Sequence, residues 1–444
     1  MLDILNPNLL CLVIGVALLL NLKLLFNKYL LFVPIIYIFS SLNCNQILSV
    51  GFFILLVYFF GRYLSSISDE NWQLKIFNIL YIFLLIIFVF AESFLMKSAL
   101  NGIGIGLVIL QSISWLYDAA MKGFNARVNF LDYCLYMFFP TKIFIGPLES
   151  TSGLFKQIQT GKREILNGDQ IKFAFYLIFL GIFKYLIVAG NIVSDRQYII
   201  NGKSYSLIEN IFFFYLHFLK IYLSFSGLIE VIRGMSLFLG FELRKNFNKP
   251  LLAVGFSDYW ARWHISLSEW TREYLFTPLS FYTRNIIGKY SSVLALIITF
   301  AFISLWHGNL INYWVFGLLH VILILVEKLF NVVWFDRSKL FSFKRFFFIT
   351  LLCVIALFFS DESIFSEILI NINNNLNSSV IIGNNCIAIL FSILLILIVG
   401  LSEIILDRIE SKSSFIFFDT VMLGVLLLII LLWPDSGNSL IYLF

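Results

Sequence analysis

The feature that most constrains this chain is a succession of long apolar runs separated by short polar connectors. Because a helix needs about 20 apolar residues to cross a bilayer, these runs predict about 11 to 13 membrane segments. The run 206–240 is longer than one span and contains Lys220, Glu230 and Arg233, so part of it should face a protein interior or a cavity. The candidate segments are residues 8–26, 29–42, 48–65, 76–96, 101–118, 128–146, 171–190, 206–240, 291–306, 311–334, 345–360, 380–406 and 414–433.

Composition supports an all-α polytopic membrane protein. Hydrophobic residues make up 60% of the 444 residues and charged residues only 13%, whereas a soluble domain carries about 25% charged residues. The long runs do not resemble the alternating segments of an outer-membrane barrel. The five cysteines are dispersed in apolar surroundings and predict neither a disulfide framework nor a zinc site.

The distribution of charge predicts the topology of the loops. The net charge of +5 fits the excess of Lys and Arg that cytoplasmic loops carry. On this rule the basic loops 151–171 and 241–290 should both be cytoplasmic. No basic region precedes the first apolar run, which favours a retained first helix over a cleaved signal peptide.

Residues 246–279 form the densest polar and aromatic block of the chain. If a helix begins near Ser257 and ends before Pro278, large apolar side chains recur at helical spacing along one face. A narrow polar strip borders that face. The pattern predicts an amphipathic helix at a membrane interface, with this apolar face and polar strip: Trp260, Trp263, Leu267, Trp270 and Tyr274, bordered by His264, Ser268 and Thr271.

Two of the four histidines are candidate catalytic residues. His307 ends an apolar run of about sixteen residues, and an ionisable side chain at membrane depth indicates function. A neutral imidazole can accept a proton from a hydroxyl; the alternative is a helix-end histidine that bonds the last carbonyls. His264 is the second candidate, or a structural residue of the helix surface. His217 and His320 lie in apolar runs and are interpreted as structural, and no histidine pair has the spacing of metal ligands.

Two further segments carry polar groups inside apolar surroundings. Residues 138–149 contain Pro140 and Pro147, which indicates either a broken helix that lines a cavity or a plain interfacial loop. Lys184 lies deep in an apolar run, where it either snorkels or pairs with a carboxylate such as Glu230. Residues 222–227 are a polar notch in the run 206–240.

Several of these blocks, in this order, resemble the membrane-bound O-acyltransferase family. The resemblance is to the bacterial branch of alginate O-acetylation and teichoic-acid D-alanylation. It covers about residues 95–444 and is most specific in 246–327. The blocks that carry it are 138–149, 181–184, 222–227, 246–250, 260–279 and 305–308, with Trp314, Gly317, His320, Glu327, Phe358, Phe359 and the ending 441–444.

The resemblance implies one multi-pass domain over 1–444, with N-terminal helices in 1–95 and a core in 96–444. In this fold a ring of helices surrounds a central funnel. His307 falls on the family's membrane-embedded histidine and His264 on its second histidine. Further candidates for the substrate and donor funnels are Trp306, Asn309, Trp260, Trp263, Ser268, Arg262, Pro140, Lys142, Lys184 and Ser226.

The implied activity is transfer of an acyl group from a cytoplasmic thioester to a hydroxyl, with no resident cofactor or metal. The donor is acetyl-coenzyme A or an acyl-carrier protein, and a further partner protein modifies an extracytoplasmic polysaccharide. The implied location is the bacterial cytoplasmic membrane. Acetyl transfer is expected, with D-alanyl transfer to a cell-wall polymer as the nearest alternative. A glycan or lipid transporter would explain the hydropathy equally well, but not the aromatic block followed by the 305–308 motif.

This chain departs from the branch pattern at three places. Ser224 and Glu230 stand where the branch usually has aspartates. Residues 280–283, Ser-Phe-Tyr-Thr, stand where the branch often has a Gly-Gly-Asn-Arg run. These positions concern the substrate funnels, so they bear on the acceptor rather than on the chemistry.

Overall fold

The structure is a computed structural model, and it describes residues 7–21, 28–90, 104–121, 128–160, 166–190, 207–307, 311–330 and 343–359. Every regular element within these ranges is helical, as the sequence predicts. The α-helices are α1 Pro7–Asn21, α2 Phe32–Phe39, α3 Cys44–Ser66, α4 Glu70–Phe90, α5 Ile105–Met121, α6 Phe130–Met137, α7 Lys156–Thr160, α8 Gly168–Ile182, α10 Leu207–Phe238, α11 Phe256–Trp260, α12 Ile265–Thr271, α13 Thr277–Ile287, α14 Ser291–His307, α15 Ile311–Leu329 and α16 Phe343–Ala356.

Five helical segments among the described residues are long and apolar enough to cross a membrane. Two shorter apolar helices, Lys28–Phe39 and Phe347–Ala356, accompany them. The predicted spans at 380–406 and 414–433 lie outside the described residues. The five segments are Cys44–Ser66, Gly168–Ala189, Tyr215–Phe238, Ile265–His307 and Ile311–Leu329.

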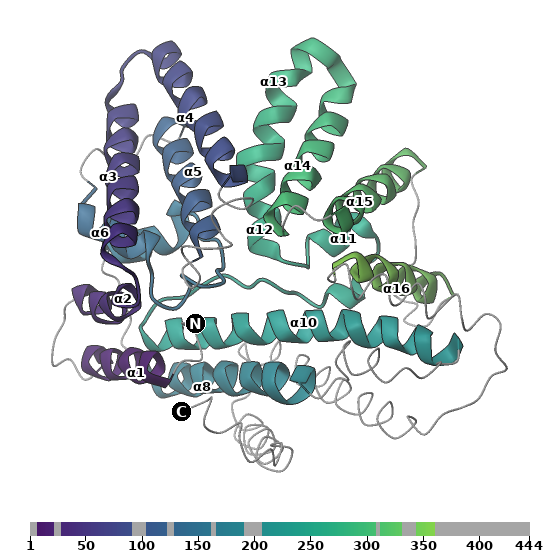
Figure 1. Cartoon of the computed structure of the whole chain (residues 1–444), viewed down its shortest axis with the longest axis horizontal. Helices are drawn as coiled ribbons and strands as arrows, with labels where there is room; N and C mark the ends of the chain where they lie inside the picture. The colour runs from purple at the N-terminus through teal and green to yellow at the C-terminus, as the bar shows by residue number, and fades with distance from the viewer. Residues whose placement is uncertain are drawn as a thin grey trace.

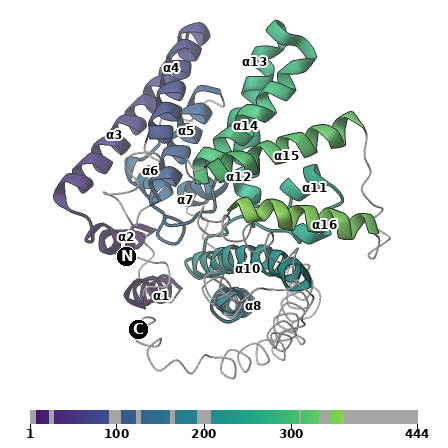
Figure 2. The same ribbon diagram turned by 45° about the vertical axis from the view of Figure 1, so that its right-hand side comes forward.

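A pair of long helices forms the base on which the other elements stand. α10 and α8 pack closely side by side, and both views show them beneath two projecting groups, one of α3, α4 and α5 and one of α13 and α14 (Figures 1 and 2). Gly181 permits this approach, because a Cβ there would clash with the carbonyl oxygen of Gly227 on α10.

The predicted pairing of Lys184 with Glu230 is confirmed. α8 continues through Phe183–Ala189 as a π-helix, and the fully buried Lys184 lies on this segment. Its Nζ is 2.7 Å from Oε1 of Glu230 on α10. Lys184 of the predicted run 171–190 and Glu230 of the run 206–240 therefore both face the protein interior.

The predicted span at 128–146 is wrong. α6 has only 8 residues, and residues 138–150 then run without regular helix through buried surroundings. The two prolines explain this path, because proline lacks the N–H that a continuing helix needs. The prediction of a broken helix is correct, and Phe144 and Ile145 of this segment line a cavity.

The predicted continuous helix from 257 to 274 is also wrong. The chain turns at residues 261–264 between α11 and α12, so the five apolar side chains do not share one face. Trp270 and Tyr274 instead pack towards α5, where Trp270 donates to Ser114 at 2.7 Å and Tyr274 to Asp118 at 3.1 Å. Pro278 does not end the helix but lies in the first turn of α13, where the missing N–H costs little.

Candidate functional site

A cavity of about 500 Å³ contains both histidines that the sequence singled out. Its walls come from α5, the 144–145 segment, α10, the α11–α12 region, α14, α15 and α16. Most of the lining is aromatic or aliphatic, and three histidines are among its polar residues. The residues central to the site are Phe225, Tyr259, Trp260, Trp263, His264, Trp306, His307, Phe316 and His320.

His264 occupies the turn between α11 and α12 in a strained backbone conformation. Its φ and ψ are 44° and 52°, a left-handed conformation that costs a non-glycine residue about 1–2 kcal/mol. Such strain persists only where the surroundings impose it, and it often marks functional sites.

Segment 241–249 imposes this turn. Ile265 N–H donates to the carbonyl oxygen of Asn246 at 2.9 Å, and Ser266 N–H donates to the Asn246 side-chain Oδ1 at 3.1 Å. Asn246 therefore caps α12 from a distance in sequence. The sequence around His264 does not reveal this contact.

The environment of His264 keeps its imidazole neutral. The ring lies with its centroid 4.8 Å from that of Phe225, and burial lowers the pKa of His264 to about 3. Its Nδ1 makes no hydrogen bond. A neutral imidazole in an apolar chamber can orient a substrate or exchange a proton with it.

His307 is the last residue of α14 and lies across from α15. Its ring centroid is 6.1 Å from that of Tyr313, and with its neighbour Trp306 it lines the same cavity as His264. Because α14 is part of the candidate span Ile265–His307, the imidazole stands at the end of a membrane helix. The structure thus brings the two sequence-predicted histidines together.

His320, interpreted from the sequence as structural, also lines the cavity. Its Nδ1–H donates to the carbonyl oxygen of Phe316 at 2.9 Å, which leaves Nε2 as the acceptor of the neutral ring. Aromatic rings enclose it, with Phe316 at 4.4 Å, Trp260 at 5.2 Å and Phe300 at 5.8 Å between centroids. The apolar surroundings that suggested a purely structural role are the wall of the chamber.

The other candidates divide between the cavity and its surroundings. Trp260, Trp263 and Trp306 line the cavity. Arg262 instead pairs with Asp258 at 2.9 Å, and Ser268 donates to the carbonyl of Trp263. Asn309 lies outside the described residues, and the remaining candidates lie in the core away from this lining: Pro140, Lys142, Lys184 and Ser226.

Lys142 is buried in a position that suppresses its charge. Its side chain is 2% exposed, its Nζ lies 4.9 Å from the Tyr136 ring centroid, and it makes no hydrogen bond. Burial lowers the pKa of Lys142 to about 7, against the attraction of Glu149. Burial likewise raises the pKa of Glu149. Neither Lys142 nor Glu149 lines the cavity, so both are part of the surrounding structure.

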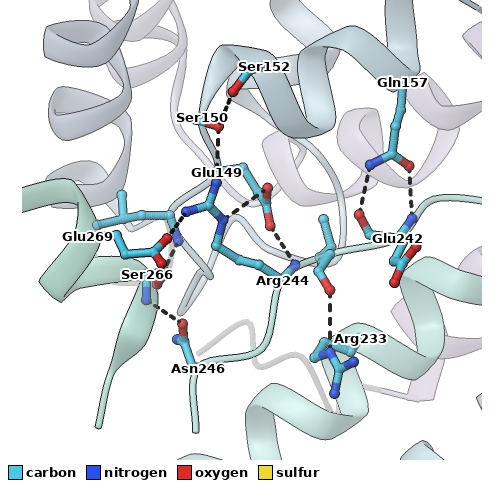
Figure 3. Close-up of polar contacts among 12 residues, drawn as sticks. Glu149, Ser150, Ser152, Gln157, Arg233, Glu242, Arg244, Asn246, Ser266 and Glu269 are labelled. Atoms are coloured by element: carbon cyan, nitrogen blue, oxygen red, sulfur yellow. Dashed lines mark hydrogen bonds and ion pairs between the residues drawn. The ribbon is translucent and has the colours of Figure 1, made fainter. Parts of the chain in front are cut away.

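Arg244 connects its own segment, 241–249, with residues 149–150 and with α12 (Figure 3). Its backbone N–H donates to Glu149 at 2.9 Å, and its guanidinium contacts Glu269 of α12 at 2.7 Å and Ser150 at 3.0 Å. Gln157 adds two hydrogen bonds to the backbone of Glu242. The two loops predicted to be cytoplasmic therefore contact each other, and Arg244 is occupied by structural ion pairs.

Comparison with known proteins adds a family. The sequence pattern of MBOAT, the membrane-bound O-acyltransferase family, matches residues 18–360. This range includes the cavity and all three of its histidines.

Individual relatives share only moderate identity with this chain. A peptidoglycan O-acetyltransferase of Helicobacter pylori is 29% identical over 209 residues, which are 47% of this chain and 39% of the relative. A probable alginate O-acetylase of Pseudomonas syringae pv. tomato is 26% identical over 255 residues, 57% of this chain and 47% of the relative. A teichoic acid D-alanyltransferase of Streptococcus thermophilus is 27% identical over 324 residues, 68% of this chain and 74% of the relative. The chain thus spans less than half the length of the first two relatives.

Proposed function

This chain belongs to the membrane-bound O-acyltransferase family, and we propose that it transfers an acyl group from a thioester to a hydroxyl inside the cavity of His264 and His307. The observation that carries the proposal is the convergence of these two imidazoles, from separate elements, on one chamber. Family membership favours this enzyme over a transporter of lipid-linked glycans.

The proposed reaction uses His307 as the general base. His307 removes the proton of the acceptor hydroxyl while the hydroxyl oxygen attacks the thioester carbonyl carbon. The carbon–sulfur bond then breaks, the proton passes to the departing sulfur, and the products are an ester and a free thiol. His264, neutral and held by Asn246, orients the donor or acceptor, and the apolar walls exclude water from the thioester.

The proposed substrates follow from the relatives. An acetyl donor and an extracytoplasmic polysaccharide acceptor are favoured, because two of the three relatives named above are O-acetylating enzymes. D-alanyl transfer to a cell-wall polymer is the alternative, since another relative is a teichoic acid D-alanyltransferase. The proposed location is the bacterial cytoplasmic membrane, with the donor entering from the cytoplasmic side and with funnels from both sides reaching His307.

A donor assay tests the proposal directly. The full chain in lipid nanodiscs is given acetyl-coenzyme A or an acylated carrier protein, each labelled in the acyl group, together with candidate glycans. We expect labelled ester to form with one donor and an equal amount of thiol to be released. If thermal unfolding shows that the protein is folded and neither donor supports transfer, the proposal is refuted.

Replacing His264 separates strain from function. His264→Gly is expected to be more stable than His264→Ala by about 1 kcal/mol, because glycine adopts the left-handed conformation without penalty. Both variants are expected to lose acyl transfer together. Thermal unfolding and the donor assay on the same preparations give the two readouts. If activity instead followed stability, with the glycine variant as active as the unmodified chain, His264 would be structural only.

A further inference from the structure

We propose that a second pocket, between α10 and segment 245–249, binds a phosphate or a similar oxyanion. The source of the anion that we infer rests on the proposed function. The binding of the anion does not. The pocket has a volume of about 40 Å³, enough for a small ion or a few water molecules. Its polar lining consists of Ser226, Glu230, Arg233, Lys245, Asn246 and Lys249.

The charge of the pocket is positive. Among the lining residues, Arg233, Lys245 and Lys249 contribute three cations and Glu230 one carboxylate. Arg233 also interacts with the carboxylates of Glu242 and Glu149 behind the lining. The Glu230 carboxylate already has an ion pair with Lys184 at 2.7 Å. The surplus of positive charge favours an anion as the occupant.

Two buried hydrogen-bond donors in the lining lack partners. Ser226 is 2% exposed and Asn246 is 1% exposed, and neither Oγ of Ser226 nor Nδ2 of Asn246 makes a hydrogen bond. A buried donor without a partner costs about 1–3 kcal/mol. Both groups can donate to an oxyanion, which accepts several hydrogen bonds at once.

Tertiary structure selects these cations from a larger basic set. Segment 241–290 is rich in Lys and Arg, but Arg244 and Arg262 are held in ion pairs with Glu269 and Asp258. Lys245 and Lys249 line the pocket, and α10 supplies Arg233 to the same lining. Two of the seven basic residues of this segment therefore lie in the pocket lining, beside Arg233 of α10.

The pocket is connected to the histidine chamber through Asn246. The side-chain Oδ1 of Asn246 accepts the Ser266 N–H at 3.1 Å, two residues after His264, while its Nδ2 is the group left for the anion. The two pockets also share a wall, because Phe225 of the chamber packs on Phe247 of the second pocket with centroids 5.1 Å apart. An anion on Asn246 would therefore hold the turn that carries His264.

Two sources supply such an oxyanion in a membrane enzyme of this kind. One is the phosphate of the donor thioester, and the other is the phosphate of an anionic lipid headgroup. Both present the same chemistry to the pocket, and the experiment separates them.

Binding is tested first with inorganic phosphate as the probe. Thermal unfolding of the full chain in dodecyl maltoside, a detergent without phosphate, is measured with and without inorganic phosphate at constant ionic strength. We expect phosphate to raise the unfolding temperature of the unmodified chain but not of the double variant Lys245→Gln, Lys249→Gln. The matched control is Arg284→Gln, Lys289→Gln, which removes the same charge from two exposed positions, one in the last turn of α13 and one just after it, and should keep the effect. No shift in the unmodified chain, or an equal shift in the pocket variant, would overturn the proposal.

Acyl transfer then identifies the source. If the donor phosphate binds here, the pocket variant raises KM for acetyl-coenzyme A about tenfold or more, as expected for lost charge-assisted bonds. Transfer from a short acyl thioester without phosphate stays unchanged. If a lipid phosphate binds, the variant instead abolishes the activation by phosphatidylglycerol over phosphatidylcholine with both donors. Protein that binds phosphate but transfers from no donor would refute the proposed function while leaving the anion site intact.

Discussion

His307→Ala is expected to lower the rate of acyl transfer about 10²–10⁴-fold, the contribution typical of a positioned general base. The variant should fold, because His307 is the last residue of α14 and its loss removes no helix-internal residue. Its kcat should fall while KM for the thioester changes little, since the base acts on the acceptor hydroxyl. Initial rates in nanodiscs, with labelled donor, measure both constants.

His307→Gln and His217→Gln complete the test. Glutamine keeps a polar side chain at 307 but cannot take up a proton, so it should be as inactive as alanine. His217 is buried on α10 and is absent from the cavity lining, so the same substitution there should leave transfer intact in protein that folds. A His307→Gln variant with near-normal kcat would exclude general base catalysis by this residue.

Lys184→Ala is expected to destabilise the protein by about 3–5 kcal/mol, because it leaves the carboxylate of Glu230 buried and without its ion-pair partner. Lys184 is 0% exposed and Glu230 8% exposed, so the carboxylate stays poorly solvated when the ammonium is lost. The pair connects the π-helical segment after α8 to α10, the two elements at the base of the fold. The unfolding temperature in nanodiscs should therefore fall sharply.

Two comparisons give this result its meaning. The double variant Lys184→Met, Glu230→Leu removes both charges and should recover much of the lost stability, because well-packed apolar groups can replace a buried pair. Arg262→Gln breaks the more exposed i,i+4 pair with Asp258 and should cost less than about 1 kcal/mol. Equal losses for Lys184→Ala and Arg262→Gln would show that the buried pair has no special weight.

Local patterns in the sequence predicted the helical class and the two candidate histidines, and they gave the Lys184–Glu230 pair as one of two alternatives that the structure decides. Hydropathy reveals membrane helices because the bilayer requires about 20 apolar residues in succession. An isolated charge in such a run must have a partner, and Lys184 and Glu230 lie in runs that could supply one to each other. Pro140 and Pro147 likewise indicated that 138–149 is not a regular helix.

The prediction of one continuous helix over 257–274 failed because contacts with distant segments override the helical spacing of its apolar residues. The spacing of Trp260, Trp263, Leu267, Trp270 and Tyr274 fits one helix face, yet the chain breaks at 261–264. Asn246 accepts hydrogen bonds from the N–H groups of Ile265 and Ser266. Trp270 and Tyr274 donate hydrogen bonds to side chains of α5. These partners lie outside residues 257–274, so the spacing of residues within that stretch cannot reveal them.

The sequence by itself determined that this is a helical, polytopic membrane protein and that His264 and His307 are its candidate catalytic residues. These properties depend on composition, hydropathy and short motifs, which are local. Only the tertiary structure decided that His264 is left-handed, that His320 enters the chamber, and which basic residues surround the second pocket. Each depends on contacts between segments far apart in the chain, and such contacts form only when the helices pack.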